Sequence, residues 1–184
     1  MNTTVIAVSG HAQNGKDTCA KFLKEAFETR GYKTRIIHYA DLLKFICKNY
    51  FDWDGNKDDA GRTLLQRVGT DVVRKKNPDF WVDFVFQLLN LFPDEWDFVI
   101  IPDTRFPNEV NGGQYRNEIP IEHMRVIRTT ENFVSPLTEE QQKHPSETAL
   151  DNVEPDFTIY NSDLDTTRNR IASYADYLIT KYKN

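Results

Sequence analysis

The chain has 184 residues, a formal net charge of −5, 39% hydrophobic and 12% aromatic residues. This length suits one domain with a sizeable core, and the composition excludes a disordered tail. The absence of a long Lys/Arg run argues against nonspecific nucleic-acid binding, and no apolar run reaches the roughly 18–20 residues of a membrane span. The start, MNTTVIAVSG, lacks signal-peptide features, and two cysteines are too few for a disulfide framework, so we expect a cytoplasmic protein.

Apolar runs that predict strands alternate along the chain with amphipathic runs that predict helices. The predicted strands are residues 3–9, 33–39, 96–103, 125–128 (following IEHM) and 156–161. The predicted helices are one that starts at Lys16 and stops at Gly31, then 40–51, 62–76, one that follows Asn77-Pro78, and 162–181. This alternation predicts an α/β fold with a five-stranded parallel sheet flanked by helices in three layers.

Spacing also predicts which helix residues face the core. Cys19 lies on the apolar side of the first helix, which predicts a buried thiol. The third helix presents an apolar face at Leu64, Leu65, Val68 and Val72. The fourth presents a stripe at Trp81, Phe84, Val85, Leu88, Leu89 and Phe92.

The stretch VSGHAQNGKDTCAKF, residues 8–22, matches the phosphate-binding pattern Gly-x-x-x-x-Gly-Lys at Gly10, Gly15 and Lys16. Asp17 stands where Ser or Thr is expected, and Thr18 comes one place later. A strand before the loop and a helix after it are the context that the motif requires. Successive backbone N–H groups and the helix N-terminus would hold phosphates, and Lys16 would reach the outer ones. The alternative is an ordinary strand–turn–helix with an exposed lysine.

We therefore expect this loop to bind ATP through Gly10, His11, Ala12, Gln13, Asn14, Gly15, Lys16, Asp17 and Thr18. A carboxylate is a good ligand for Mg²⁺, so Asp17 can serve in place of the usual hydroxyl, with Thr18 in the same turn. The segment NKDD at residues 56–59 matches a guanine-binding motif of GTPases. It precedes the third strand, which is the wrong order for that motif, so we interpret it as part of a polar loop.

Several blocks together resemble the phage and bacterial deoxynucleoside monophosphate kinases. These blocks are SGHAQNGKDT, HYADLLK, GRTLLQRVGTDVVR, DFWV, IPDTRFPNE and HPSE, which span residues 8 to about 150. The resemblance implies a P-loop kinase core in a single domain over residues 1–184, with a helical acceptor-binding insertion at about 40–95 and a lid-like segment at about 129–151. It implies transfer of the ATP γ-phosphoryl group to a deoxynucleoside 5′-monophosphate, with Mg²⁺. It also allows a homodimer.

Two alternatives remain. Animal phosphomevalonate kinases share a cruder version of these blocks, including a Gly-Lys-Asp loop. A nucleotide-binding module without kinase activity is the second alternative, and the missing order of guanine motifs argues against it. If the acceptor is a phosphate, its second pKa of about 6 means that no general base is needed, so the relevant side chains are cations.

The third helix carries a polar row at Arg62, Gln66, Thr70 and Arg74, spaced four residues apart. Each step drifts about 40° around a regular helix, so the four share a face. Arginine grips phosphate in a bidentate manner, so we expect Arg62 and Arg74 to hold the acceptor, with Arg62 also catalytic and Gln66 in the same site. The alternative is a solvated helix face.

Other candidates lie at the carboxyl ends of predicted strands, where ligands bind in parallel sheets. Asp103 is expected to meet Mg²⁺ or the substrate, or else to cap the next turn, and Arg105 follows it. Asp41 and Lys44 follow the second strand on the acceptor side. Tyr39 either stacks on a base or packs, and Trp81 is expected in the core or in the pocket wall.

Arg128 ends the fourth strand and is the predicted stabiliser of transferred charge, whereas Arg125 is expected to be exposed. Residues 130–151 are a candidate lid over ATP. His144 in HPSE is expected to be structural and is assigned no proton transfer; Glu147 shares that block. Asn161, after the last strand, is expected to contact adenine through its backbone.

Overall fold

A computed structural model describes residues 3–115, 117–130, 135 and 137–183. Five parallel strands form one sheet in the order β2-β3-β1-β4-β5. The strands are β1 (Thr4–Ser9), β2 (Thr34–Ile36), β3 (Phe98–Ile101), β4 (Ile121–Arg128) and β5 (Phe157–Asn161). The predicted α/β class and five-stranded parallel sheet are therefore confirmed.

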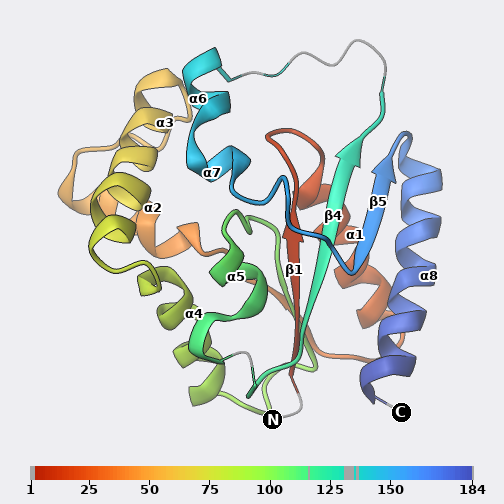
Figure 1. Cartoon of the computed structure of the whole chain (residues 1–184). Helices are drawn as coiled ribbons and strands as arrows, with labels where there is room; N and C mark the ends of the chain where they lie inside the picture. The colour runs from red at the N-terminus through yellow and green to blue at the C-terminus, as the bar shows by residue number, and fades with distance from the viewer. Residues whose placement is uncertain (1–2, 116, 131–134, 136, 184) are drawn as a thin grey trace.

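Helices cover both faces of this sheet (Figure 1). They are α1 (Lys16–Glu28), α2 (Ala40–Tyr50), α3 (Asp59–Gln66), the π-helix η1 (Arg67–Arg74), α4 (Phe80–Leu91), α5 (Pro107–Asn111), the 3₁₀ helix η2 (Gly113–Tyr115), α6 (Glu139–Lys143), α7 (Pro145–Thr148) and α8 (Leu164–Lys183). In Figure 1, α1 and α8 lie on one side of the sheet, and α4 and α5 lie on the other. No helix in the described part of the chain is long and apolar enough to cross a membrane.

Successive side chains of β1 point to opposite faces of the sheet, so they belong to two different hydrophobic cores. Ile6 and Val8 pack with α1 and α8, whereas Val5 packs with α4. All of β1 is buried, because helices cover both faces of a parallel sheet. The predicted burial of Cys19 is confirmed, and burial raises the pKa of its thiol to about 12.

The segment predicted as one regular helix at 62–76 is two helices of different pitch. It begins earlier, at Asp59, because the carboxylate of Asp58 accepts the backbone N–H of Gly61 at 2.8 Å and caps α3. It then continues as the π-helix η1. The wider turn of a π-helix rotates the later apolar residues out of line with those of α3. The prediction for Val72 was wrong, since its side chain is 41% exposed.

Helix α4 begins at Phe80, two residues after Pro78, so it follows Asn77-Pro78 as predicted. The predicted stripe holds for Trp81, Val85 and Leu89, which are buried, but Phe84 and Phe92 are exposed. The buried face instead includes Val82 and Phe86. A helix that is apolar nearly all round has no polar side that must face the solvent. Packing alone therefore decides which of its aromatic residues face the sheet.

Candidate active site

The loop between β1 and α1 has the backbone that a phosphate-binding loop needs. Gly10, Gln13 and Gly15 have positive φ angles of 140°, 61° and 94°. A Cβ on Gly10 would lie 2.3 Å from the carbonyl oxygen of Val126, so glycine is required there. The amine of Lys16 donates to the carbonyl oxygens of Gly10 at 2.7 Å and His11 at 2.9 Å, so the side chain lies folded over the loop.

Asparagine side chains fix this loop to the sheet. Asn14 donates to the carbonyl of Val126 at 3.0 Å, and Asn161 donates to the carbonyl of Asn14 at 2.8 Å. The hydroxyl of Thr167 then donates to the side-chain oxygen of Asn161 at 3.1 Å. The carbonyl of Asn161 accepts the backbone N–H of Thr129, so this residue anchors the loop, a role its position in the sequence did not indicate.

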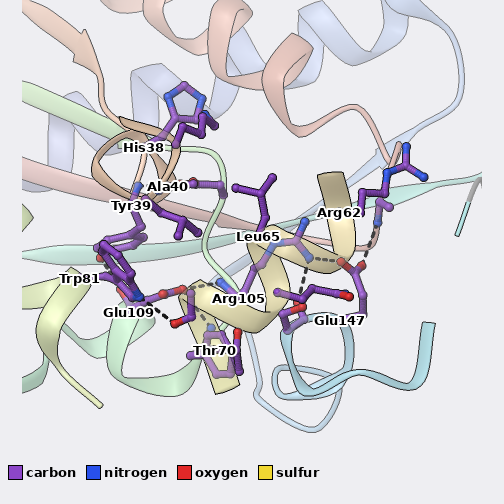
Figure 2. A pocket seen from close by; sticks show the side chains of 18 of the residues that line it. His38, Tyr39, Ala40, Arg62, Leu65, Thr70, Trp81, Arg105, Glu109 and Glu147 are labelled. Carbon is purple, nitrogen blue, oxygen red and sulfur yellow. Dashed lines mark hydrogen bonds and ion pairs between the residues drawn. The ribbon is translucent and has the colours of Figure 1, made fainter. Parts of the chain in front are cut away.

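A cavity of about 510 Å³ opens beside the loop (Figure 2). Its lining brings together two groups of residues that are far apart in the chain. From the loop come Ala12, Gln13, Lys16 and Asp17, and from α3 and η1 come Arg62, Gln66, Thr70 and Arg74. Lys44, Trp81, Asp103 and Arg105 also line it, whereas Asp41, Thr18 and Arg128 do not.

The charge of the cavity wall is positive. The cations Lys16, Lys44, Lys57, Arg62, Arg74 and Arg105 outnumber the acids Asp17, Asp103, Glu109 and Glu147. The wall also has an apolar part, made by Leu43, Leu65, Trp81 and Phe106. A site of this composition fits a ligand that carries both phosphate and a flat apolar ring.

Arg74 is held inside the protein by an acid that sequence reasoning missed. Its guanidinium pairs with Glu109, which is 2% exposed, and stacks over Phe106 at 3.9 Å. The other oxygen of Glu109 accepts the backbone N–H of Arg105 at 2.7 Å. Burial raises the pKa of Glu109 to about 7, with Arg74 acting in the opposite direction. The sequence did contain a signal for this acid, because Glu109 follows Arg105 by four residues in a turn that begins with Pro107.

Asp103 caps a helix across the sheet. Its two oxygens accept the backbone N–H groups of Tyr39 at 3.0 Å and Ala40 at 2.9 Å, at the start of α2. Asp103 therefore binds backbone N–H groups as the alternative expected, but at the start of α2 and not in the next turn. Tyr39 is 4% exposed and donates to the carbonyl of Glu109 at 3.1 Å, so it packs.

Asp17 lies at the mouth of the cavity. It is 3.5 Å from His38, which is also 3.5 Å from Asp41. The hydrogen bond to His38 lowers the pKa of Asp17 and raises that of His38. Asp41 in turn contacts Lys44 at 3.2 Å. An ionised, exposed Asp17 fits a hard cation that keeps most of its water and phosphate ligands. Among the described residues, no group of three or more His, Cys, Asp or Glu side chains is arranged so that it could hold a metal ion.

The HPSE block forms the wall between the loop and Arg105. His144 caps α7 by accepting the backbone N–H of Ser146 at 3.2 Å, and it lies 3.6 Å from Asp71 of η1. The structural role expected for His144 is therefore seen. Glu147, with a side chain 6% exposed, pairs with Arg105 and accepts the backbone N–H of Ala12 at 3.3 Å.

The two arginines of β4, Arg125 and Arg128, lie outside the acceptor row, and Arg125 differs from expectation. Arg128 is exposed, and it donates to the carbonyl of Gln13 at 3.0 Å and to the hydroxyl of Thr130 at 2.7 Å. Arg125 is half-buried rather than exposed, and its guanidinium donates to the carbonyls of Leu150 and Val153. It therefore holds the segment after α7 on the sheet. Of the expected lid, residues 131–134 and 136 lie outside the described residues, and Leu137, Ser146 and Glu147 line the cavity.

If the loop binds ATP, as the sequence predicts, the lowered pKa of Lys16 leads us to expect proton uptake on binding. Burial, aided by Arg105, lowers the pKa of Lys16 to about 8. Bound triphosphate favours the ammonium form, so at pH 8 we expect about 0.5 proton taken up per ATP, and about tenfold weaker binding at pH 9 than at pH 7. Calorimetry in two buffers of different ionisation enthalpy measures the uptake. The Lys16→Arg variant stays charged, so an unchanged uptake in it would assign the proton elsewhere.

No protein-family model and no curated protein matches this sequence. Solved structures do match in fold. A sugar kinase from Janibacter sp. HTCC2649 aligns with a TM-score of 0.53 at 12% identity, over 95% of this chain and 95% of that one. The APS kinase of Mycobacterium tuberculosis aligns with a TM-score of 0.50 at 9% identity, over 95% of this chain and 98% of that one. The chain thus has the three-layer fold of the P-loop kinases.

Proposed function

We propose that this protein transfers the γ-phosphoryl group of ATP to a deoxynucleoside 5′-monophosphate. The observation that carries the proposal is the single cavity lined by both the phosphate-binding loop and the row from Arg62 to Arg74. Two anionic substrates that react with each other must meet in one site of positive charge. The resemblance of the sequence blocks to deoxynucleoside monophosphate kinases, and the kinase fold, support the same reaction.

ATP is the proposed ligand of the loop. Its phosphates would accept hydrogen bonds from the backbone N–H groups of residues 10–18. The amine of Lys16 would leave the loop carbonyls and also donate to these phosphates. Asp17 and Thr18 are the proposed holders of Mg²⁺, which when bound neutralises phosphate charge. We expect the nucleoside of ATP to extend toward Arg128 and Asn161, which bind the carbonyls of Gln13 and Asn14 on the β4–β5 side of the loop.

The acceptor is the proposed ligand of the row. Arg62 and Lys44 would grip its phosphate, and its base would lie against Leu65 and Trp81. Within the described residues, the side chains of Gln66 and Thr70 make no hydrogen bond, so both can read the edge of a base. Each has a donor and an acceptor.

A phosphate acceptor fits this cavity better than an alcohol does. An alcohol needs a general base, and the acids of the wall are engaged: Asp103 with two backbone N–H groups, Glu109 with Arg74, and Glu147 with Arg105. Asp17 has a lowered pKa, which makes it a weak base. A phosphate oxygen is already ionised at neutral pH and needs only positioning and positive charge.

Replacement of Arg62 by alanine is expected to raise the KM of the acceptor by about 10- to 100-fold and that of ATP by less than about threefold. The reason is that Arg62 belongs to the row on α3 and η1 to which the proposal assigns the acceptor. Steady-state kinetics with each substrate varied separately measure both constants. The matched control is Arg67→Ala, since Arg67 is an exposed arginine of η1 outside the cavity. Equal increases in both constants would move Arg62 out of the acceptor site.

The proposed function is tested by coupled detection of ADP release from ATP and Mg²⁺, with each deoxynucleoside and ribonucleoside monophosphate added separately. Turnover that depends on one or a few deoxynucleotides is the expected result. No stimulation by any nucleotide would overturn the proposal, and phosphomevalonate is the next acceptor to add. ATP hydrolysis unaffected by every acceptor would indicate a nucleotide-binding module instead.

A further inference from the structure

Arg105 occupies the boundary between the two proposed binding sites. It lines the cavity together with Lys16 of the loop and with the row from Arg62 to Arg74. Figure 2 shows Arg105 beside Glu147. Arg105 is close enough to Lys16 to lower the pKa of the lysine. A cation in this position faces the phosphoryl group as it passes from donor to acceptor, which is where positive charge accelerates the reaction most.

The guanidinium of Arg105 is fixed on one edge. Its Nη1 donates to the carbonyl of Ser146 at 2.8 Å and to Glu147, while its backbone N–H is bound by Glu109. Among the described residues, its Nε and Nη2 groups have no hydrogen-bond partner. One edge of the guanidinium is therefore anchored, and the other donors remain available to phosphate oxygens.

The carboxylate that anchors Arg105 also binds the phosphate-binding loop. One oxygen of Glu147 pairs with Arg105, and the other accepts the backbone N–H of Ala12 at 3.3 Å. The side chain is 6% exposed, so this bridge is shielded from water. The HPSE sequence builds it locally: His144 caps α7, Pro145 starts the helix, and Glu147 then points to the loop.

We propose that Glu147 is a positioning residue that holds the Arg105 guanidinium in register with the phosphate-binding loop, so that Arg105 contacts the transferred phosphoryl group. This inference rests on the proposed phosphoryl transfer, and it assigns a role to the HPSE block. It moves the transfer-stabilising role from Arg128, which lies outside the cavity, to Arg105. A misplacement of the guanidinium by about 1 Å is enough to cost about 100-fold in rate.

The test is a double-mutant cycle of Glu147→Gln and Arg105→Ala. Glu147→Gln keeps the size of the side chain and removes its charge, and it is expected to lower kcat by about 10- to 100-fold with the KM of ATP changed less than about threefold. In the Arg105→Ala background the same substitution is expected to change kcat by less than about threefold, because its effect passes through Arg105. The control is Glu139→Gln, an exposed acid of α6, with no effect.

A second variant guards against misfolding. Glu147→Asp keeps the charge but is too short to span Arg105 and Ala12 together, and we expect it to slow turnover as Glu147→Gln does. Equal slowing by Glu147→Gln with and without Arg105 would overturn the inference. A lower KM of ATP at unchanged kcat would also overturn it, because Glu147 would then compete with phosphate.

Each rate is measured twice, as transfer to the nucleotide and as slow ATP hydrolysis by water. Hydrolysis needs no nucleotide acceptor, so failure of the nucleotide panel overturns the proposed function alone. The cycle still tests Glu147 on the hydrolysis rate. Additive effects on that rate count against the inference whichever acceptor the enzyme uses.

Discussion

Replacement of Lys16 by alanine is expected to lower kcat/KM by about 10³-fold while leaving the fold intact. The amine lies over the carbonyls of Gly10 and His11, so it borders the space in which the loop would hold a phosphate. We expect the interaction of this amine with the transferred phosphoryl group to strengthen between the ground state and the transition state, so kcat should fall more than ATP affinity. Coupled ADP release over a range of ATP concentrations gives kcat and kcat/KM separately.

The stability of the Lys16→Ala variant separates catalysis from folding. Burial lowers the pKa of Lys16 from 10.5 to about 8, so below pH 8 the charged amine costs the folded state free energy. Its removal is therefore expected to leave the melting temperature at pH 7 unchanged or higher. Lys21→Ala on the exposed face of α1 is the matched control, with wild-type rate. Wild-type turnover in Lys16→Ala would exclude the loop from the mechanism.

Replacement of Arg105 by alanine is expected to lower kcat by about 10²- to 10³-fold and also to destabilise the fold. The variant leaves Glu147 buried without its ion partner, which costs about 1–3 kcal/mol of unfolding free energy. Both effects come from one guanidinium with two edges, one facing the cavity and one facing α7. Kinetics and urea denaturation measure them separately.

Arg105→Lys is the informative companion variant. The ammonium keeps the charge but cannot hold Glu147 and Ser146 on one edge while presenting donors to phosphate on the other. We expect it to recover most of the stability and little of the rate. Full recovery of kcat by lysine would mean that charge alone matters at this position and that the anchored geometry does not.

The sequence by itself determined the sheet and the loop. β-branched runs separated by amphipathic segments predicted five parallel strands, and the spacing of Gly10, Gly15 and Lys16 predicted the strand–loop–helix. Strand propensity, the period of apolar residues and the conformational freedom of glycine are local properties, because they depend only on residues that are close in sequence. The face of η1 was predicted less well, because a π-helix has no distinct local signal.

Only the tertiary structure decided which charged residues are available for substrate. Arg74 is neutralised by Glu109, which lies 35 residues away in sequence, and Arg105 is anchored by Glu147, 42 residues away. Asp103 is bound by backbone N–H groups that are more distant still, 63 and 64 residues away. Partners at such separations meet because parallel strands bring their carboxyl ends to one edge of the sheet. Local sequence can name the cations of this site, but the pairing that holds or frees each one exists only in the folded chain.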